Sequence, residues 1–475
     1  MTPEEFRRIG HELIDWIADY HERLAAQPVM ARTNPGDVRA RLSATPPEQP
    51  ESWPDVVRDL DDVIVPGLTL WQHPSFFGYF PANAELSSVL GDYLSTGLGV
   101  LGLSWQSSPA LTELEEVTTD WFRSMLGLSD AWSGVIQDTA STSTLVALLS
   151  ARERATNFSM TRAGLQAETA PLAVYASEHA HSSVEKAALL AGFGREYVRA
   201  VPVDEHHAMR ADALAAMMRE DARRGVTPCA VVVTVGTTAS TALDPVASAA
   251  DAASEHGAWL HVDAAMAGSA MILPECRWMW SGIERADSVV VNAHKWLGAV
   301  FDTSVYYVRD PQHLVRVMST NPSYLQSAAD GQVRNYRDWG IPLGRRFRAL
   351  KLWLLIRTEG VEGLRARLRR DMHNAQWLAQ QVDATPGWAR LAPVPLQTVC
   401  LRYEPGGLSG EDLDAFTQAW AARVNASGAA YVTPAVLNGQ WMVRVSVGAI
   451  RTEREHVEAL WKLLRSEAER VPEPG

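Results

Sequence analysis

One lysine in this 475-residue sequence stands where it could act as a nucleophile. Only four of the 43 basic residues are lysines, namely Lys186, Lys295, Lys351 and Lys462. Lys295 comes shortly after the β-branched run Ser288 to Val291, so we expect it at the end of a buried strand. Burial lowers the pKa of a lysine by disfavouring its ammonium form, which frees the amine to form a Schiff base. The other three lysines lie in helical patterns, where we expect solvent-exposed faces.

Two other motifs could complete a site around Lys295. Asp263 follows the expected strand Ala258 to Val262 and precedes two alanines, which would let a flat ring approach closely. Five hydroxyl-bearing residues lie within 139–144, just before a helical pattern, and helix N-termini bind phosphate. Either motif alone could be a simple helix cap. Together with Lys295 they predict pyridoxal 5′-phosphate, because its pyridine nitrogen needs a carboxylate partner and its phosphate needs hydrogen-bond donors.

Histidines near the strand ends leave a metal site, and hence a metal hydrolase, as an alternative. His179 and His181 are two residues apart, as are His261 and Asp263, and such pairs share one face of a strand. The sequence contains no further cluster with a recognisable metal-site spacing and no Gly-rich nucleotide motif. We therefore expect no metal, and we favour His181 as a residue that stacks on a cofactor ring.

A long polar stretch from Asn321 to Gly340 has the composition of a lid. Loops of this length inside a domain usually cover an active site or are disordered. A lid suits this chemistry, because a reactive carbon formed next to the cofactor must be shielded from water and protonated. Tyr324 is the candidate proton donor in this stretch.

The first two of three expected regions would position these residues. Residues 1–83 begin with an amphipathic helix capped by Thr2 and Glu5 and continue as a proline-rich segment with too little core to fold alone. Residues 84–358 alternate β-branched runs with helical stretches, which predicts an α/β domain with a mostly parallel sheet. Ligands of such sheets bind at the carboxyl ends of the strands. The expected strands are Leu172 to Ala176, Ala230 to Val235, Ala258 to Val262 and Ser288 to Val291.

Residues 359–475 have the pattern of a smaller α+β domain. The dipeptide Asn438-Gly439 predicts a hairpin, because both residues tolerate the positive φ angles of a type I′ turn. Thr452 and Glu455 have the spacing of a capping box that would begin a last amphipathic helix.

The composition limits the kinds of partner. A formal net charge of -13 without a run of basic residues argues against nucleic acid and against an anionic membrane surface. Cys229, Cys276 and Cys400 are odd in number and widely spaced, so we interpret them as reduced core residues. The sequence shows neither a signal-peptide pattern nor an apolar stretch of about 18 residues. We expect a cytoplasmic protein whose partner is a small molecule.

These motifs and several others resemble the group II pyridoxal-phosphate decarboxylases, specifically the aromatic L-amino acid decarboxylases. The motifs that carry the resemblance are His73-Pro74, Tyr79-Phe80-Pro81, Ser108 to Glu115, Ala180 to Lys186, His261 to Ala265, His294-Lys295-Trp296 and Ile341 to Arg346. The resemblance implies a fold-type I transferase-like large domain and a homodimer in which the N-terminal segment wraps over the partner. It also implies conversion of tryptophan, 5-hydroxytryptophan, tyrosine, DOPA or phenylalanine to an arylalkylamine and carbon dioxide.

The same resemblance implies roles for individual residues. The catalytic residues would be Lys295 as the Schiff-base lysine, Asp263 as the pyridine partner, His181 as the ring-stacking histidine and Tyr324 as the donor that protonates Cα. The cofactor contacts would be Ala140, Ser141, His181, Thr238, Asp263, Ala265, Asn292, His294 and Lys295. The substrate pocket would include Trp71, Tyr79, Phe80, Ala82, Leu103 and Gly344.

Departures from the family pattern bear on the substrate more than on the reaction. Ala82, Leu103 and Met266 stand where threonine, phenylalanine and tyrosine are common, so hydrogen bonds that recognise a catechol or phenol would be weaker. Aldehyde synthases of the family tend to replace the tyrosine or the histidine that this sequence keeps as Tyr324 and His181. Simple decarboxylation is therefore favoured, with an aromatic acetaldehyde synthase or a non-catalytic cofactor-binding relative as alternatives. Asp138, a carboxylate close to the expected phosphate, is unexplained.

Overall fold

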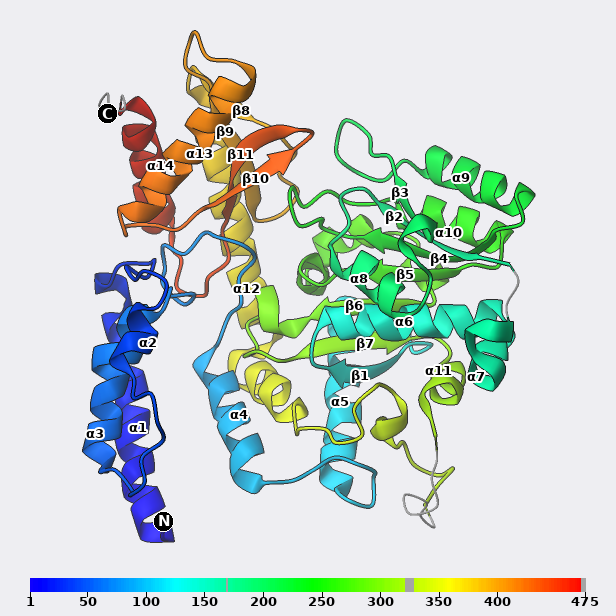
Figure 1. Cartoon of the computed structure of the whole chain (residues 1–475), viewed down its shortest axis with the longest axis horizontal. Helices are drawn as coiled ribbons and strands as arrows, with labels where there is room; N and C mark the ends of the chain where they lie inside the picture. Colours follow the sequence, from blue (N-terminus) through cyan, green and yellow to red (C-terminus); the bar gives the residue numbers. More distant parts are fainter. Residues whose placement is uncertain (168–169, 321–328, 471–475) are drawn as a thin grey trace.

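A large sheet forms the centre of the protein, as a computed structural model describes it for residues 1–167, 170–320 and 329–470 (Figure 1). Its seven strands lie in the order β1-β7-β6-β5-β4-β2-β3. They are β1 Ser133–Gln137, β2 Leu172–Ser177, β3 Val198–Val201, β4 Thr227–Thr234, β5 Trp259–Asp263, β6 Ser288–Asn292 and β7 Ser304–Val308. β7 pairs antiparallel with both β1 and β6, and the other pairs are parallel. The expected α/β fold with a mostly parallel sheet is confirmed.

Helices cover both faces of this sheet, which explains why its strands are continuous apolar runs. Along β4, Val231 and Val233 belong to one hydrophobic core, and Ala230 and Val232 belong to another. The first core includes residues of α5 Pro109–Leu126, α9 Ala211–Arg223 and α10 Val246–Glu255. The second includes residues of α6 Ala140–Ala155, α8 Ser183–Leu190 and α11 Pro311–Met318, and the short α7 Ser159–Ala163 packs on α6.

A second, antiparallel sheet lies in the C-terminal third in the order β10-β11-β9-β8. Its strands are β8 Trp388–Arg390, β9 Thr398–Tyr403, β10 Thr433–Leu437 and β11 Gln440–Ser446, with α13 Gly410–Ala426 and α14 Arg454–Glu469 beside them. Asn438 and Gly439 join β10 to β11 with φ of 50° and 75°, so the predicted hairpin is confirmed. The predicted cap of α14 is wrong, because Glu453 caps it by pairing with His456, while Thr452 donates to the Pro74 carbonyl.

A long helix, α12 Ala349–Ala384, passes from the large sheet to the small one (Figure 1). It kinks at Gly360, whose φ of 64° is left-handed, and this kink lies beside the boundary that the sequence predicts at 358/359. Its first half packs on α4 Leu86–Leu98. A Cβ at Gly91 would lie 2.6 Å from the Leu350 carbonyl oxygen, so only glycine allows this approach. The two domain boundaries, at 83/84 and 358/359, stay predictions.

The N-terminal region contacts the small sheet of its own chain. It begins with α1 Pro3–Arg23, which has the predicted Thr2–Glu5 capping box, and continues through α2 Asp37–Arg41 and α3 Trp53–Asp59. The following extended segment joins the small sheet, because Phe77 donates to the Tyr431 carbonyl at 2.8 Å and Ser446 donates to the Phe77 carbonyl at 2.9 Å. The Phe77 ring is fully buried in the core of that sheet. This proline-rich segment therefore gains its core from another part of the chain.

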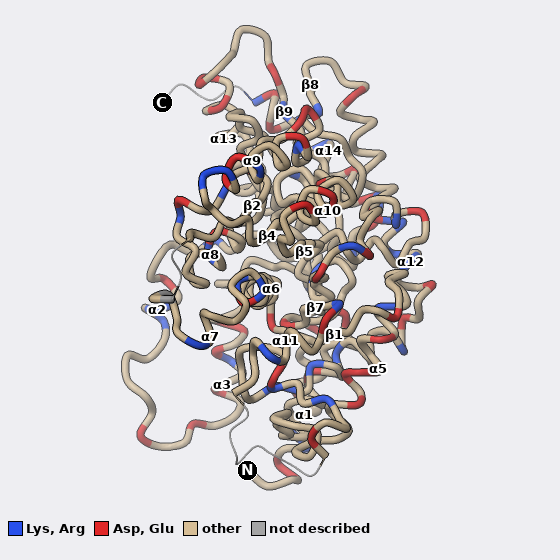
Figure 2. The backbone as a smooth tube through the Cα atoms, turned by 90° about the vertical axis from the view of Figure 1, so that its right-hand side faces the viewer, with Lys and Arg blue, Asp and Glu red and all other residues tan. Residues whose placement is uncertain are grey.

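The surface carries both signs of charge. In the view of Figure 2, basic and acidic residues are interspersed over the backbone. None of the helices within the described residues has the length and apolar character that a membrane span requires.

Candidate functional site

A cavity of about 240 Å³ opens at the carboxyl ends of β4, β5 and β6. This is where an α/β sheet binds ligands, because the strands end together and their connections diverge. The lining residues are Phe80, Thr139, Ala140, Ser141, His181, Ser183, Thr234, Gly236, Thr238, Asp263, Ala265, Met266, Asn292, His294 and Lys295. The structure thus brings all of the predicted cofactor contacts around one cavity.

Lys295 lies in a short turn, η9 Ala293–Leu297, that directly follows β6. Its φ of -96° and ψ of -113° interrupt the turn. The side chain is half-buried. Desolvation lowers the pKa of Lys295, the Asp263 carboxylate opposes this, and the Arg444 charge lowers the pKa further. Lys295 thus lies at the end of a buried strand, as the sequence predicts, and its role as a nucleophile stays a prediction.

Of the other three lysines, which we expect on exposed helix faces, one is buried. Lys186 and Lys462 are exposed, as predicted. Lys351 is fully buried, so the prediction of a solvent-exposed face is wrong for it. The reason is the close packing of α12 on α4, which the helical pattern of α12 alone does not reveal.

Asp263 ends β5 and is almost fully buried at 4% exposure. Its Oδ1 accepts a hydrogen bond from the Ala265 N–H at 3.0 Å, and its other oxygen has no partner among the described residues. Thr234, its neighbour on β4, is likewise buried in the cavity wall with an unpartnered hydroxyl. A buried carboxylate with a free oxygen needs a hydrogen-bond donor. A protonated pyridine nitrogen is a donor of this kind.

The opposite end of the lining consists of hydrogen-bond donors. Thr139 caps α6 through its hydroxyl, and the first N–H groups of the helix, from Ala140 and Ser141 onward, begin at the cavity. The side-chain Oδ1 of Asn292 accepts from the Ser304 hydroxyl at 2.6 Å, which leaves the side-chain Nδ2 group of Asn292 to donate. These donors fit a phosphate. Asp138 is still unexplained, because one of its oxygens is buried and has no partner among the residues that the structure describes.

Two histidines present the same type of donor to the cavity. The Ser183 N–H donates to His181 Nδ1 at 3.1 Å, and the Thr303 N–H donates to His294 Nδ1 at 2.9 Å. Each neutral ring therefore carries its proton on Nε2. Desolvation lowers the pKa of both, aided by Lys295, and the pKa of His294 falls to about 4. His181 is exposed in this chain, which leaves its ring free to contact a ligand.

Of the six residues predicted for the substrate pocket, only Phe80 lines the cavity. Trp71 and Tyr79 are partly exposed and stack on each other with ring centroids 5.3 Å apart, next to Phe76 and Tyr431. The Ala82 carbonyl accepts a hydrogen bond from Gln72. The remaining two, Leu103 and Gly344, do not line the cavity, and the nearest side chain to Gly344 is Leu101. The predicted proton donor, Tyr324, lies outside the described residues.

Arg444 on β11 is a residue that the sequence analysis missed. It is 3% exposed, its guanidinium carbon lies 4.2 Å from the centre of the Phe80 ring, and one N–H group donates to the Tyr79 carbonyl. Within the described parts of the chain it has no ion-pair partner, and burial lowers its pKa to about 10. Its position in β11 gives no signal of this role, because the contact depends on how the segment with Tyr79 and Phe80 packs on the small sheet.

The metal alternative gains no support. Among the described residues, no group of three or more His, Cys, Asp or Glu side chains could hold a metal ion. A lysine, a buried carboxylate, an imidazole and a helix N-terminus instead surround one cavity at the strand ends of a mostly parallel sheet. Fold and site together define a fold-type I pyridoxal-phosphate enzyme.

Comparisons with known proteins identify the family. The pyridoxal-dependent decarboxylase conserved domain matches residues 35–404. The chain is 39% identical to tryptophan decarboxylase 2 of Oryza sativa subsp. japonica, covering 99% of this chain and 96% of that protein. It is 38% identical to phenylacetaldehyde synthase of Arabidopsis thaliana, covering 98% and 96%. The crystal structure of Oryza sativa TDC with PLP and tryptamine matches with a TM-score of 0.95 and 35% identity, covering 98% of both chains.

The protein belongs to the pyridoxal-dependent decarboxylases. The predictions of the family, the fold class and the cofactor from the sequence are thereby confirmed.

Proposed function

We propose that this protein decarboxylates an aromatic L-amino acid to the corresponding arylalkylamine and carbon dioxide. The observation that carries the proposal is the cavity in which Lys295, Asp263 and His181 meet beside Phe80. The aromatic substrate class is supported by similar proteins that are named as decarboxylases of tryptophan, tyrosine or DOPA. Apolar walls at Phe80, Ala265 and Met266 suit a flat aromatic side chain.

The residues of this chain would share the work as follows. When bound, pyridoxal 5′-phosphate accepts the electron pair that stays behind as carbon dioxide leaves Cα. Lys295 would hold the cofactor at its aldehyde carbon, and Asp263 would keep a proton on the pyridine nitrogen. The N–H groups at the start of α6, the Asn292 amide and the His294 Nε2–H would hold the phosphate.

Three further residues would act on the cofactor ring or on the substrate. The His181 ring would stack on the cofactor ring and orient it, since its Nδ1 is fixed by Ser183. Arg444 adds positive charge next to Phe80 and so favours entry of the substrate carboxylate. Tyr324, outside the described residues, would return a proton to Cα after carbon dioxide has left.

A homodimer in the cytoplasm is part of the proposal. Several large apolar side chains are exposed on and after α4, and contiguous apolar surface of this kind marks an interface. They are Leu90, Tyr93, Leu94, Leu98 and Leu101. Leu103 and Gly344 lie in the same region and away from the cavity of their own chain, so a second copy could receive them in its substrate pocket. The three free, buried cysteines suit a reducing compartment.

A panel of amino acids tests the reaction and the substrate class. Purified protein with added cofactor is given tryptophan, 5-hydroxytryptophan, tyrosine, DOPA, phenylalanine, histidine and glutamate, and carbon dioxide and amine are measured. We expect release of both in equal amounts from one or more of the aromatic substrates. Release from histidine or glutamate alone would contradict the aromatic assignment. Sedimentation of the same sample gives the oligomeric state, for which we expect a dimer.

Aldehyde synthesis is the second candidate, because an aldehyde synthase is among the similar proteins. That reaction consumes oxygen and yields aromatic acetaldehyde, ammonia and hydrogen peroxide besides carbon dioxide. We expect amine from the wild type and a shift toward aldehyde for Tyr324→Phe, since the ring stays and only the proton donor is lost. Unchanged amine output from the variant would assign Tyr324 the role of an apolar plug. Aldehyde as the main wild-type product would overturn the proposal.

A further inference from the structure

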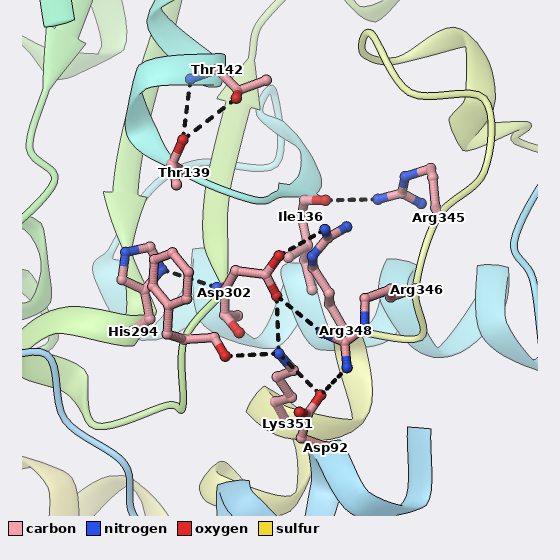
Figure 3. A network of polar contacts seen from close by, with 12 residues as sticks. Asp92, Ile136, Thr139, Thr142, His294, Asp302, Arg345, Arg346, Arg348 and Lys351 are labelled. Carbon is pink, nitrogen blue, oxygen red and sulfur yellow. Dashed lines mark hydrogen bonds and ion pairs between the residues drawn. The ribbon is translucent and has the colours of Figure 1, made fainter. Parts of the chain in front are cut away.

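A cluster of charged residues around the buried Lys351 lies between α4 and α12, outside the cavity. We call Asp92, Asp302, Arg346, Arg348 and Lys351 the Lys351 cluster (Figure 3). The Lys351 ammonium donates to Asp302 Oδ1 at 3.0 Å and to the Phe301 carbonyl at 3.1 Å, and it forms an ion pair with Asp92 Oδ1 at 3.1 Å. Two of its three N–H donors therefore form hydrogen bonds to the 301–302 segment, and its charge also pairs with α4. Lys351 is completely buried, so its ammonium group stays among these three oxygens.

Each carboxylate of the cluster has a second partner. Arg348 donates to Asp302 at 2.8 Å, and Arg346 donates to Asp92 at 2.8 Å. Although burial alone would raise it, hydrogen bonds from Arg348 and Lys351 lower the pKa of Asp302 to about 2. Burial of charges costs about as much free energy as their attraction returns, so such a cluster does little for net stability. Fixing the position of a chain segment is a better-attested role for it.

The segment that the cluster fixes is the loop 298–303, which returns from η9 to β7. Val300 also donates to the Ser88 hydroxyl of α4 at 2.9 Å, so the loop is held from two helices. Directly after Asp302, the Thr303 N–H donates to His294 Nδ1 at 2.9 Å, and the His294 N–H donates to the Thr303 carbonyl at 3.1 Å. Figure 3 shows His294 next to Asp302, with Lys351 below them. Asp302 and its neighbour Thr303 thus connect the cluster to His294, whose side chain lines the cavity.

We propose that Lys351 is a positioning residue of the cofactor site. By holding Phe301 and Asp302 it keeps the Thr303 N–H against His294 Nδ1, which fixes the ring orientation and leaves the Nε2–H as a donor toward the phosphate end of the cavity. This inference rests on the proposed role of His294 as a cofactor contact. Lys351 itself does not line the cavity and touches neither cofactor nor substrate.

Lys351→Met tests the proposal in the full-length protein, because methionine keeps an unbranched chain and removes the charge. Arg348 and Arg346 still pair with the two carboxylates, so folding should survive. We measure the dissociation constant of pyridoxal 5′-phosphate by absorbance titration of the apoprotein, and KM and kcat at saturating cofactor. We expect cofactor binding to weaken about tenfold, the effect of losing one hydrogen bond to a charged group, with substrate KM nearly unchanged. An unchanged dissociation constant would overturn the proposal.

A double variant separates positioning from general destabilisation. If Lys351 acts through His294, then Lys351→Met has no further effect on cofactor binding in a His294→Ala background. Equal weakening in both backgrounds would contradict the proposed route. Failure of His294→Ala alone to weaken binding would instead contradict the proposed role of His294.

Arg199→Met is the matched control. Arg199 pairs with the buried Asp221, which keeps the Tyr175 hydroxyl as a second partner, and neither residue lines the cavity. This variant should lower the melting temperature and leave cofactor binding unchanged. Asp302→Asn is a second probe should Lys351→Met fail to fold. It removes the charge that Lys351 holds, and we expect the same weakening of cofactor binding that disappears in the His294→Ala background. Normal cofactor binding by Asp302→Asn would also count against the proposal.

Discussion

The two sides of the cavity are built in different ways. The side assigned to the cofactor stands on the ends of adjacent strands, where Thr234 and Asp263 are register neighbours and both are buried. The side assigned to the substrate begins at Phe80 and continues into Trp71 and Tyr79, which are 38% and 48% exposed on a connecting segment. One side is thus fixed by a single sheet, and the other depends on segments that meet only after folding. Cofactor chemistry can then stay constant while substrate recognition changes.

Backbone conformation shows the same contrast. β5 and β6 are regular, and every residue in them is buried. Tyr79 has a φ of 49°, a left-handed value that costs energy for a residue with a side chain. It is held by its N–H bond to Thr433 at 2.7 Å and by Arg444 at its carbonyl, both from the small sheet. The substrate side therefore stores strain that the small sheet maintains.

Lys295→Ala should give the largest effect, because it removes the nucleophile of the cofactor side. We expect complete loss of turnover and of covalent cofactor attachment, since no other lysine lines the cavity. Borohydride reduction followed by peptide mass spectrometry detects the attachment site. Covalent attachment of the reduced cofactor to another lysine of the variant would contradict the assignment of Lys295 as the attachment site.

Asp263→Asn should lower kcat by about 10² or more, because an amide cannot hold the pyridine nitrogen protonated. The Asn carbonyl oxygen can still accept from the Ala265 N–H, so we expect normal folding by circular dichroism. Steady-state kinetics at saturating cofactor measures the loss. A kcat close to that of the wild type would exclude Asp263 as the ring partner.

Arg444→Met tests whether the substrate side influences the cofactor side. Arg444 lowers the pKa of Lys295, so its removal should raise that pKa. Capture of the cofactor requires the neutral amine, whose fraction falls about tenfold for each pH unit below the pKa. The rate of capture by the apoprotein, measured from pH 6 to 10 by stopped-flow absorbance, should shift to higher pH. Arg444→Lys keeps the charge and should resemble the wild type, and an identical shift in both variants would remove the electrostatic explanation.

Trp71→Ala should give the smallest effect and only on the substrate side. Loss of a stacked aromatic pair weakens an interaction by roughly 0.5–1.5 kcal/mol, so we expect KM to rise about 2–10-fold. The dissociation constant of the cofactor should stay the same, and Trp71→Phe should recover most of the KM. Weaker cofactor binding in Trp71→Ala would show that the two sides are not separable.

The sequence predicts one side of this comparison much better than the other. The strands before Asp263 and Lys295 are β-branched runs, and the residues after them must gather at one sheet edge once the sheet is parallel. Lys351 and Arg444 escape such reasoning, because their surroundings come from helices and strands far away along the chain. The same holds for Thr452. Its hydroxyl donates to the carbonyl of the distant Pro74 and therefore does not cap the last helix as predicted. The sequence also does not predict where Leu103 and Gly344 lie, because their positions depend on how distant segments of the chain pack together.

The backbone pairing of Phe77 with Tyr431 and Ser446 has a consequence for synthesis. A chain emerges from the ribosome N-terminus first, and its early parts usually fold before the later ones are made. Here the segment that carries Phe80 waits for strands that are translated more than 350 residues later, as the Tyr79 contact with Thr433, 354 residues away, shows. A nascent or truncated chain could assemble the large sheet and its lysine yet would lack a wall of the cavity. We therefore expect activity only from chains that include the strands β10 and β11.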